Sequence, residues 1–394
     1  MLIAQSGGPT VAINASLSGA VKRAMKHPEI DQIWGGRNGL EGILNEQFVD
    51  LRQKLNSQEA FRQLESTPAM ALGSCRYKLP EEPGSVYEKL RGIFSRYEIG
   101  YFFYIGGNDS MDTILKLSQS FGSVGDDVKC VGIPKTIDND LPCTDHTPGF
   151  GSAARYIATS VAEIACDSAV YNVPSVTIVE IMGRNAGWLT AASVLARRGG
   201  CSAPHMICLP EVPFQLEKFL KRLGHLQPQV QNPIIAVSEG VRFAEGGYVS
   251  SQGEQVDAFG HRTLAGVGKY LEQLVRDNLG CKVRSIELNV LQRSASHLYS
   301  ATDIGEACRI GAEAVSFAVQ GKTGVMATFE RVSDHPYLLA YKSADIRLIA
   351  NREKTVPLEW IDVDRYDVKE ALTQYLSPLI CDENGCGIPV YFSL

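Results

Sequence analysis

The sequence predicts an α/β fold built from parallel βα units, in a folded chain that is long enough for two or three domains. Apolar runs of five to seven residues alternate with longer amphipathic stretches, and many of these runs end in Gly or Pro. Hydrophobic residues make up 44% and charged residues 21% of the chain, close to the averages of about 45–50% and about 25% for folded globular proteins. The length of 394 residues corresponds to two or three domains at roughly 150 residues each.

Five apolar segments are expected to be strands that each lead into a helix: residues 2–4, 101–105, 130–133, 177–179 and 234–237. The second segment is the clearest, because it consists of aromatic and aliphatic residues only and is followed by a Gly pair. The next helix is expected to begin near Asn108, since the apolar residues Ile114, Leu117 and Phe121 are three or four positions apart. A polar stretch at 243–260 is expected to be a loop or hairpin between domains.

The charge balance and the apolar pattern exclude two classes of partner. With 38 Lys and Arg against 44 Asp and Glu, the net charge is −6, opposite in sign to that of proteins that bind nucleic-acid phosphates. No run of 18 apolar residues is present, and the chain opens without the basic region of a signal peptide. We therefore expect no nucleic-acid partner, no membrane contact and a cytoplasmic location.

The ten cysteines form no CxxC pair of the kind that binds zinc or undergoes redox reactions. They are expected to be reduced and mostly buried thiols. Cys381 and Cys386 are close enough in the sequence to pair, but a reducing compartment favours free thiols in a solvated loop.

The loops that follow the expected strands are the candidate sites, because ligands of open α/β sheets bind beyond the carboxyl ends of the strands. In the first loop, at 5–10, Gly8 lets backbone amides approach a phosphate at a helix N-terminus. The second loop, at 106–110, again places a Gly pair before a helix. A tight turn is the alternative for the first loop, and a first-turn acid that complements the helix dipole is the alternative for Asp109.

The third loop, at 134–140, carries the most chemistry. Lys135, Thr136, Asp138 and Asp140 directly follow a strand. Two carboxylates beside a Lys and a Thr suit a general base together with a group that orients it or a metal ion. A turn rich in Asp and Asn is the alternative.

Arginines and a glutamate mark the remaining loops. Arg184 lies between two glycines after the fourth expected strand and suits either a phosphate or an ion pair with Glu180. Glu239 follows the fifth expected strand. Two later arginines, Arg284 and Arg293, suit either a phosphate site or surface ion pairs.

Seven motifs, taken together and in this order, resemble the phosphofructokinase family over roughly residues 1 to 345. They are GG at 7–8, LGSCR at 72–76, GGNDS at 106–110, PKTIDND at 134–140, EIMGR at 180–184, SEG at 238–240 and LQR at 291–293. The resemblance implies two Rossmann-like three-layer α/β domains with mostly parallel sheets. It also implies transfer of a phosphoryl group from ATP or pyrophosphate to the 1-hydroxyl of fructose 6-phosphate, which gives fructose 1,6-bisphosphate in glycolysis and gluconeogenesis.

The same resemblance implies a domain organisation. Residues 1–140 together with about 292–345 would form a domain that binds pyrophosphate and Mg²⁺, and residues 141–291 would form a sugar-phosphate domain. Residues 346–394 would be a C-terminal extension. The resemblance further implies a homodimer or a homotetramer.

Individual residues receive roles from the resemblance. Asp138 would take the proton from the sugar hydroxyl, while Thr136 and Asp140 would lie beside the transferring phosphoryl group and its Mg²⁺. Gly8 and Arg76 would contact the donor. The sugar and its 6-phosphate would be bound by Met182, Gly183, Arg184, Glu239, Arg284 and Arg293. These roles agree with the demands of phosphoryl transfer, which are alignment and charge neutralisation.

The choice of donor rests on Asp109 and Lys135. ATP-using relatives carry glycines at both positions, whereas the pyrophosphate-using branch of the family carries Asp and Lys. The carboxylate of Asp109 would fill the space of the ATP α-phosphate, and like charges about 4 Å apart repel by about 4 kcal/mol at an effective dielectric constant of about 20. Lys135 would stabilise the transition state on pyrophosphate. We therefore expect pyrophosphate as donor, phosphate as second product and a reaction that runs in both directions.

Five positions depart from the pattern of relatives. Asn108 replaces an Asp that helps to hold Mg²⁺, so coordination is expected through its amide oxygen, a water or a neighbouring carboxylate. Ser175 and Val290 replace residues that help to bind the 6-phosphate in relatives. Ser18 and Lys22 stand where bacterial ATP-dependent enzymes place effector-binding arginines, which implies weak or no nucleotide control.

Two alternatives remain open from the sequence. One is an ATP-dependent enzyme with an unusual loop sequence, and the other is a catalytically inactive subunit that binds sugar phosphates. Asn108 favours the inactive subunit. Asp138 and Lys135 argue against it, because a subunit without catalysis has no need of them.

Overall fold

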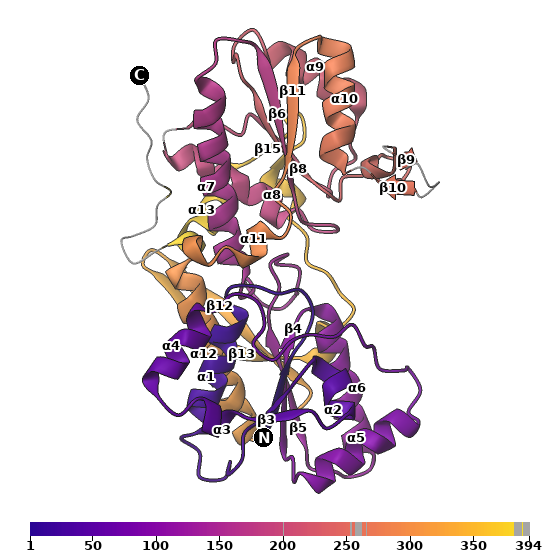
Figure 1. The fold of residues 1–394 in the computed structure, drawn as a ribbon, viewed down its shortest axis with the longest axis vertical. Coiled ribbons are helices and arrows are strands. Elements are labelled where there is room, and N and C mark those ends of the chain that lie inside the picture. The colour runs from indigo at the N-terminus through magenta and orange to yellow at the C-terminus, as the bar shows by residue number, and fades with distance from the viewer. Residues whose placement is uncertain (200, 253, 257–261, 265, 382–387, 389–394) are drawn as a thin grey trace. The chain divides into compact units, whose positions relative to one another are not determined.

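The computed structural model describes residues 1–199, 201–252, 254–256, 262–264, 266–381 and 388. The chain divides into two compact units (Figure 1). Unit 1 comprises Met1–Ser152 and Arg293–Lys354, and unit 2 comprises Ala153–Gln292 and Thr355–Leu394.

The boundaries between the units differ from the expected ones in two respects. The chain leaves unit 1 after residue 152 rather than 140, and it returns at 293, close to the expected 292. The expected C-terminal extension is divided between the units. The reason is packing: Ile346 and Ile349 belong to a hydrophobic core of unit 1, whereas Tyr366 belongs to that of unit 2.

Unit 1 contains a seven-stranded sheet in the order β13-β12-β5-β4-β1-β2-β3. Its strands are β1 (Leu2–Gln5), β2 (Trp34–Gly36), β3 (Phe48–Asp50), β4 (Tyr101–Gly106), β5 (Lys129–Pro134), β12 (Val325–Asp334) and β13 (Tyr337–Asp345). The inner strands run parallel, and the edge strands β3 and β13 are antiparallel to their neighbours. The segment that returns after unit 2 thus supplies two strands of this sheet.

Helices cover both faces of this sheet (Figure 1). Side chains alternate along a strand, so Phe103 and Ile105 share a core with α1 (Ile13–Ala24), α4 (Gln58–Ser66) and α12 (Ala301–Val319). Phe102 and Tyr104 share the other core with α2 (Gly39–Leu44), α5 (Ser85–Arg96) and α6 (Asn108–Ser123). The short helix α3 (Leu51–Lys54) follows β3. Unit 1 is therefore a three-layer α/β unit.

Unit 2 contains a four-stranded parallel sheet in the order β11-β6-β8-β7. Its strands are β6 (Ser175–Ile181), β7 (Met206–Cys208), β8 (Ile234–Ser238) and β11 (Lys282–Glu287). One face packs on α9 (Leu216–Leu226) and α10 (Val267–Leu279). On the other face lie α8 (Trp188–Ala192) and α7 (Phe150–Ala169), where Ser168 contacts Thr177 of β6 at 3.4 Å (Figure 1).

The remaining elements are short. They are α11 (Leu291–Ser294), α13 (Glu370–Leu376) and two antiparallel strand pairs, β9 (Glu254–Val256) with β10 (Arg262–Leu264) and β14 (Ile361–Asp362) with β15 (Asp367–Val368). The stretch at 243–260 contains β9 and lies within unit 2 rather than between domains. Residues 253 and 257–260 of this stretch lie outside the described residues.

The expected fold class is confirmed. All five expected strands are present as β1, β4, β5, β6 and β8, each at least one residue longer than expected. The helix expected near Asn108 is α6, which begins at that residue. Local patterns predicted these elements correctly because each strand is a short, mainly apolar run that is mostly buried.

The cysteines differ in part from the expectation. Eight of them are free thiols, of which Cys75, Cys130 and Cys208 are buried. Cys381 is disulfide-bonded, so the expectation of a free thiol is wrong at this position. Cys386 lies outside the described residues.

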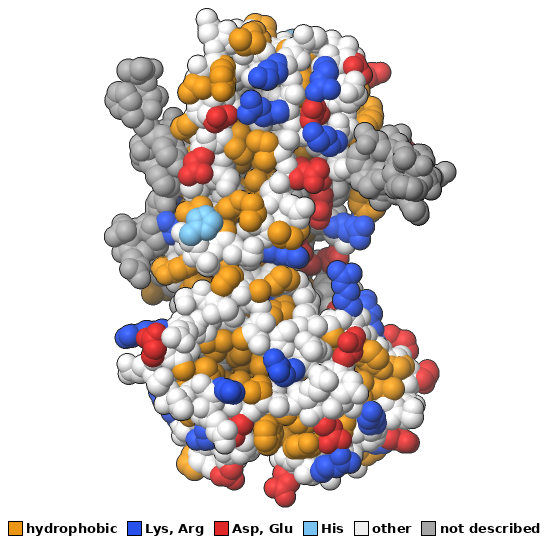
Figure 2. All heavy atoms as spheres, in the orientation of Figure 1, with side chains coloured by type: hydrophobic (Ala, Val, Ile, Leu, Met, Phe, Trp, Pro, Cys, Tyr) orange, Lys and Arg blue, Asp and Glu red, His pale blue; other side chains and the backbone are white. Residues whose placement is uncertain are grey.

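Two features of the structure concern nucleic acids and membranes, the two classes of partner that the sequence excludes. On the face shown in Figure 2, acidic and basic side chains are mixed over the surface. None of the helices in the described part of the chain combines the length and the apolar character needed to cross a membrane.

Candidate active site

The loops that follow β1, β4 and β5 lie side by side at the carboxyl edge of the sheet of unit 1. The three strands are neighbours in the order β5-β4-β1. Their last residues pair, Gln5 with Ile105 and Gly106 with Pro134. The structure therefore brings together the first three loops that the sequence predicted to carry chemistry.

Lys135 is buried among these loops, with 2% of its surface exposed. Its Nζ donates a hydrogen bond to the backbone oxygen of Gly8 at 2.6 Å. Burial lowers the pKa of Lys135 to about 8, although Asp138 and Asp140 favour its charged form. A buried ammonium group at this edge of the sheet is stabilised when an anion binds beside it.

Glycines allow the first loop to approach cationic side chains closely. Gly7 has a φ of +82°, and a Cβ there would lie 3.2 Å from Nζ of Lys135. A Cβ at Gly8 would lie 3.5 Å from Nη1 of Arg293. The Nε of Arg293 is buried and has no hydrogen-bond partner. Two cationic side chains thus converge on one Gly-Gly turn, as an anion-binding site requires.

Thr136 and Asp138 lie in a loop whose backbone is held by neighbouring residues. The N–H of Asp138 donates to Oγ1 of Thr136 at 3.1 Å. The N–H of Thr136 donates to the oxygen of Pro148 at 3.2 Å, and Oγ1 of Thr147 donates to the oxygen of Thr136 at 2.8 Å. Asp138 itself is half-buried.

Asp140 has the side chain best suited to a divalent cation. Its Oδ1 is buried without a hydrogen-bond partner, and burial raises the pKa of its carboxyl group. A buried carboxylate oxygen is costly unless an ion or a ligand satisfies it. In the part of the chain that the structure describes, no three His, Cys, Asp or Glu residues form a metal site by themselves. This arrangement fits Mg²⁺, which takes one or two carboxylates and completes its shell with phosphate oxygens and water.

Asn108, the expected metal ligand, has backbone partners. Its Oδ1 accepts a hydrogen bond from the N–H of Asn351 at 2.6 Å, and its Nδ2 donates to the oxygen of Arg352 at 2.5 Å. Both ends of the amide are therefore bonded to one segment of the chain. The oxygen that would coordinate a metal ion already accepts a hydrogen bond.

Asp109 is exposed in the first turn of α6 and forms an ion pair. Its Oδ1 lies 2.8 Å from Nζ of Lys78. Lys78 belongs to the loop before α5, in which Oγ of Ser74 donates to the oxygen of Gly7 at 2.9 Å. Arg76 lies between Ser74 and Lys78 in the sequence and is exposed. The LGSCR motif therefore lies along the Gly-Gly turn.

In unit 2, the loops after β6 and β8 meet in the same way. The last residues of these strands pair, and the N–H of Gly183 donates to Oε1 of Glu239 at 3.4 Å. Gly183 has a φ of +133°, and a Cβ there would lie 2.6 Å from the oxygen of Ala186. The N–H of Met182 donates to Oε1 of Gln292 at 3.2 Å. Met182, Gly183 and Glu239 are thus grouped at one edge of the sheet.

Glu180 and Arg184 have separate partners. The Oε2 of Glu180 accepts a hydrogen bond from the N–H of Gly268 at 2.7 Å, at the start of α10. Burial raises the pKa of Glu180 to about 7. Arg184 is exposed, and its guanidinium lies 5.7 Å from the centre of the Tyr248 ring. The alternative of an ion pair between Arg184 and Glu180 is therefore not realised in this structure.

Arg284 lies apart from the grouped residues of unit 2. It is in the middle of β11, opposite Thr177, and its Nη1 pairs with Oδ2 of Asp167 at 3.2 Å. Ser175 is the first residue of β6, at the end of the strand remote from Met182. Val290 is exposed in the turn after β11.

Ser18 and Lys22 of α1 share a partner on α4. The Oγ of Ser18 and the Nζ of Lys22 each lie 2.5 Å from Oε1 of Glu65. Both side chains therefore have an internal partner at the positions where relatives bind effectors.

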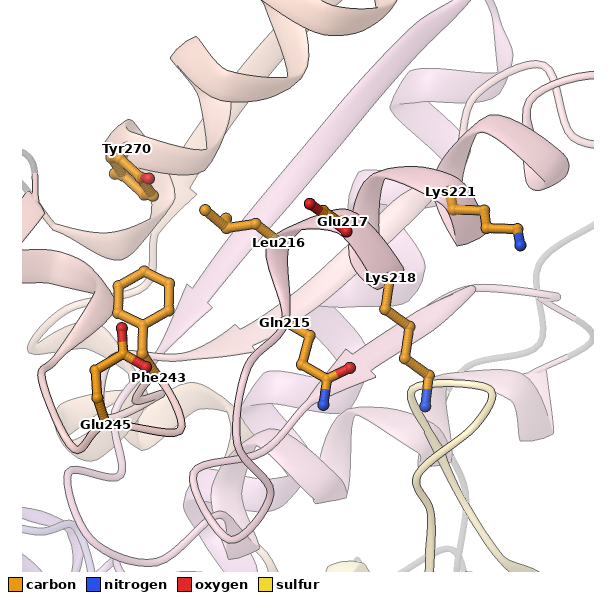
Figure 3. A pocket seen from close by; sticks show the side chains of 8 residues that line it. All are labelled: Gln215, Leu216, Glu217, Lys218, Lys221, Phe243, Glu245 and Tyr270. Carbon is orange, nitrogen blue, oxygen red and sulfur yellow. The ribbon is translucent and has the colours of Figure 1, made fainter.

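A cavity of about 750 Å³ lies elsewhere in unit 2, beside the first turn of α9 (Figure 3). Its lining residues are Gln215, Leu216, Glu217, Lys218, Lys221, Phe243, Glu245 and Tyr270. Lys218 and Lys221 point away from Phe243 and Tyr270 (Figure 3), and Nζ of Lys218 pairs with Asp364 at 3.0 Å. The polar groups do not converge, and the cavity contains none of the expected site residues.

The family model of phosphofructokinase matches residues 1–318, a range that includes all seven motifs. The chain belongs to the phosphofructokinase family. Its two cationic groups at the Gly-Gly turn and the carboxylates of the third loop are thus features of a phosphofructokinase.

Relatives within the phosphofructokinase family match nearly the whole chain. A protein of Methylococcus capsulatus named pyrophosphate-fructose 6-phosphate 1-phosphotransferase is 42% identical over 400 residues, which cover 99% of this chain and 94% of the relative. A protein of the same name from Halomonas elongata is 41% identical over 386 residues, which cover 97% and 91%. The crystal structure of the pyrophosphate-dependent phosphofructokinase from Nitrosospira multiformis has a TM-score of 0.88 and 40% identity, covering 98% of this chain and 92% of that one.

Two lysines that contact the phosphofructokinase loops were missed by sequence reasoning. Lys78 stands two residues after Arg76, the last residue of the LGSCR motif. A second basic residue so close to Arg76 was the sequence feature that could have indicated its role. Lys354 donates its N–H to the oxygen of Asp140 at 2.7 Å. No local pattern marks Lys354, because it is distant in the sequence from the loop that it contacts.

Proposed function

We propose that this chain transfers a phosphoryl group from pyrophosphate to the 1-hydroxyl of fructose 6-phosphate, which gives fructose 1,6-bisphosphate and phosphate. One observation carries the proposal: buried Lys135 and the carboxylate of Asp109 stand at the two loops next to the Gly-Gly turn. Relatives at 41% and 42% identity carry the name of this activity. The reaction belongs to glycolysis and gluconeogenesis.

Pyrophosphate is proposed to bind against the Gly-Gly turn. Gly8 lets the backbone approach the donor, and Lys135, Arg293 and Arg76 supply positive charge around it. Alignment and charge neutralisation are the main demands of phosphoryl transfer. Asp109, held by Lys78, would repel the additional phosphate of ATP.

Asp138 is proposed as the general base. It accepts the proton of the 1-hydroxyl as the sugar oxygen bonds to phosphorus. The bond between that phosphorus and the bridging oxygen of pyrophosphate breaks, and phosphate leaves with the electron pair. In the reverse reaction Asp138 returns its proton to the sugar oxygen. Thr136, whose Oγ1 accepts from the N–H of Asp138, keeps the loop in place.

Mg²⁺ is the proposed cofactor, with Asp140 as its main protein ligand and Asp138 next to it. The buried and unpartnered Oδ1 of Asp140 supports this assignment. When bound, Mg²⁺ neutralises phosphate charge. Asn108 is left out of the ligand set, because its amide is bonded to the backbone of Asn351 and Arg352.

Residues of unit 2 are proposed to bind the sugar. Met182, Gly183 and Glu239 lie together at one edge of the sheet, and Arg184 is exposed beside them. Arg284 is proposed to bind the 6-phosphate. Arg293, for which the resemblance implied the same role, is proposed to bind the donor instead, because its Nη1 lies beside Gly8. For Arg284 this requires an exchange of its present partner, Asp167, for the phosphate.

We also propose that the chain forms a homodimer or a homotetramer. Three neighbouring apolar residues of unit 2, Val170, Tyr171 and Val173, are 70%, 53% and 55% exposed. Large exposed apolar side chains that adjoin one another are typical of association surfaces. Sedimentation equilibrium of the purified chain tests this proposal, and a monomer at micromolar concentration would contradict it.

The two alternatives are less well supported. An ATP-dependent enzyme would have to accommodate the α-phosphate next to Asp109. The inactive subunit rested on Asn108, and the bonds of Asn108 to Asn351 and Arg352 give that residue another role.

Phosphorus NMR tests the proposed reaction directly. With fructose 6-phosphate, pyrophosphate and Mg²⁺, the pyrophosphate signal should fall while phosphate and a sugar 1-phosphate appear in equal amounts. With fructose 1,6-bisphosphate and phosphate, pyrophosphate should appear. Phosphate release without a sugar product would indicate hydrolysis, and an unchanged spectrum would favour the inactive subunit.

A further inference from the structure

A four-residue segment of unit 1, Asn351–Lys354, lies outside the family match, which ends at residue 318. We call it the strap. It follows β13 and a 3₁₀ turn at Ile346–Leu348. The strap is bonded to two of the three loops that carry the donor site.

The first attachment of the strap is to the start of α6. The side-chain amide of Asn108 makes two hydrogen bonds to the strap backbone. Its Oδ1 accepts from the N–H of Asn351 at 2.6 Å, and its Nδ2 donates to the oxygen of Arg352 at 2.5 Å. The Nδ2 of Asn351 donates to Oδ1 of Asp112 at 2.8 Å. Three hydrogen bonds thus join the strap to the start of α6, which carries Asp109.

The second attachment is made by Lys354, on the loop that carries Asp138 and Asp140. Its N–H donates to the oxygen of Asp140 at 2.7 Å. Its Nζ donates to the oxygens of Asp145 and Thr144 at 2.7 and 3.1 Å and approaches Oδ1 of Asn139 at 3.4 Å. One side chain therefore bonds to both ends of the segment 139–145.

The segment that Lys354 holds has an unfavourable backbone conformation. Asn139 and Cys143 have φ values of 53° and 61°, in the left-handed region that non-glycine residues rarely adopt. Such conformations persist only where surrounding contacts enforce them. Lys354 contacts the segment on either side of Cys143, while Oδ1 of Asp140 remains without a hydrogen-bond partner. The backbone of the loop is fixed, and the carboxylate remains available to a ligand.

We propose that Lys354 is a positioning residue: it fixes the backbone at Asp140 and thereby aims the carboxylates of Asp138 and Asp140. Asn108 has the related task of tying the strap to the second donor loop. Burial lowers the pKa of Lys354 to about 8. The kinetic part of this inference rests on the proposed function, and its structural part does not.

Lys354→Met tests the proposal, because it removes the ammonium group and keeps an apolar side chain of similar length. We expect kcat with pyrophosphate to fall about 10- to 100-fold, with less than about a threefold change in the KM for fructose 6-phosphate, because misplacement of reacting groups affects the chemical step. Lys342→Met is the matched control. Lys342 is an exposed lysine of the same unit that pairs with Glu330, and its loss should change neither constant.

Hydrogen exchange separates this proposal from the proposed function. In Lys354→Met, backbone amides in 136–149 should exchange at least about tenfold faster, while those of β1 and β4 keep their wild-type rates. This result is expected whether or not pyrophosphate is the donor. If the wild type lacks activity with pyrophosphate, the proposed function fails, and the exchange data still decide the role of Lys354.

A folded Lys354→Met variant with wild-type kcat and wild-type exchange would overturn the proposal. A uniform rise in exchange over the whole unit, with kcat per folded molecule unchanged, would also overturn it by indicating a general role in stability. If the Met variant does not fold, Lys354→Gln replaces it, because an amide still donates to one of the backbone oxygens. The same local rise in exchange and a smaller fall in kcat are then expected, and wild-type values for both would contradict the inference.

Discussion

The carboxylate of Asp109 and the ammonium group of Lys78 form an ion pair of 2.8 Å at the donor loops. Asp109 stands in the first turn of α6, where the positive end of the helix dipole favours a negative charge. Both side chains are about 70% exposed, so water and salt weaken their attraction. The pair therefore contributes little to stability.

Asp109→Gly should shift donor choice towards ATP. Removal of the carboxylate removes both the steric and the electrostatic obstacle to the α-phosphate of ATP. The kcat/KM with ATP should therefore rise at least about tenfold relative to that with pyrophosphate. Steady-state kinetics with both donors measure this ratio. Asp127→Asn removes another exposed carboxylate of unit 1 and is the control. A donor ratio that does not move in Asp109→Gly would support the ATP-dependent alternative.

The kcat/KM for pyrophosphate, which reports on the free protein, should fall as the pH rises through about 8. Burial lowers the pKa of Lys135 to about 8, so its stabilising positive charge is lost above that pH. In Lys135→Arg the guanidinium stays charged, and the remaining activity should lack this alkaline decline. The pKa of Lys354 is lowered to a similar value, so Lys354→Met is measured in parallel. An alkaline decline that is unchanged in both variants would rule out both lysines as its source.

Asp140→Asn should separate activity from stability. Loss of the proposed Mg²⁺ ligand should lower kcat more than about 100-fold and weaken Mn²⁺ binding measured by electron paramagnetic resonance. Burial raises the pKa of Asp140, which means that its ionised form destabilises the fold at neutral pH. The Asn variant should therefore keep the wild-type Tm or exceed it by a few degrees in metal-free buffer. Full Mn²⁺ affinity in this variant would show that the metal lies elsewhere.

His146 should make the stability of unit 1 depend on pH. Its Nδ1 and Nε2 lie 2.8 Å from carboxylate oxygens of Asp145 and Glu306. Burial disfavours the imidazolium, but the two carboxylates outweigh burial and raise the pKa of His146 to about 9. Because the folded-state pKa is raised, the stabilisation is complete below the unfolded-state value of about 6.5 and is lost as the pH rises through about 9.

Urea unfolding of His146→Gln tests this dependence. At pH 6 the variant should lose about 3 kcal/mol, because Glu306 loses its cationic partner, while Asp145 keeps its ion pair with Arg331. At pH 9.5 the wild type has itself lost most of that stabilisation, so the difference between the two proteins should be much smaller. An equal difference at both pH values would mean that His146 does not change its protonation state between them in the folded protein.

The sequence predicted most of what is local and little of what joins distant segments. The run at 101–105 and the Gly pair after it define β4 and the start of α6 without help from the rest of the chain. The position of Asp138 and Asp140 after β5 is equally local. The contact of Lys354 with Asn139 spans 215 residues and exists only because β12 and β13 extend the sheet of unit 1.

Asn108 shows why a motif can predict a position correctly and leave its role open. The motif placed Asn108 at the start of α6, where it lies. Its partners, Asn351 and Arg352, come from a segment without any recognisable pattern. The first domain boundary could not be read from the sequence for a related reason: it falls inside the continuous helix α7.

The decisive measurement is a comparison of pyrophosphate and ATP as donors. It gives the ratio of kcat/KM for pyrophosphate to that for ATP, on one preparation with saturating fructose 6-phosphate and Mg²⁺. We expect a ratio of at least about 100 in favour of pyrophosphate, because Asp109 excludes ATP and Lys135 acts on pyrophosphate. Turnover with ATP at a ratio near or below one would contradict the assignment of both residues.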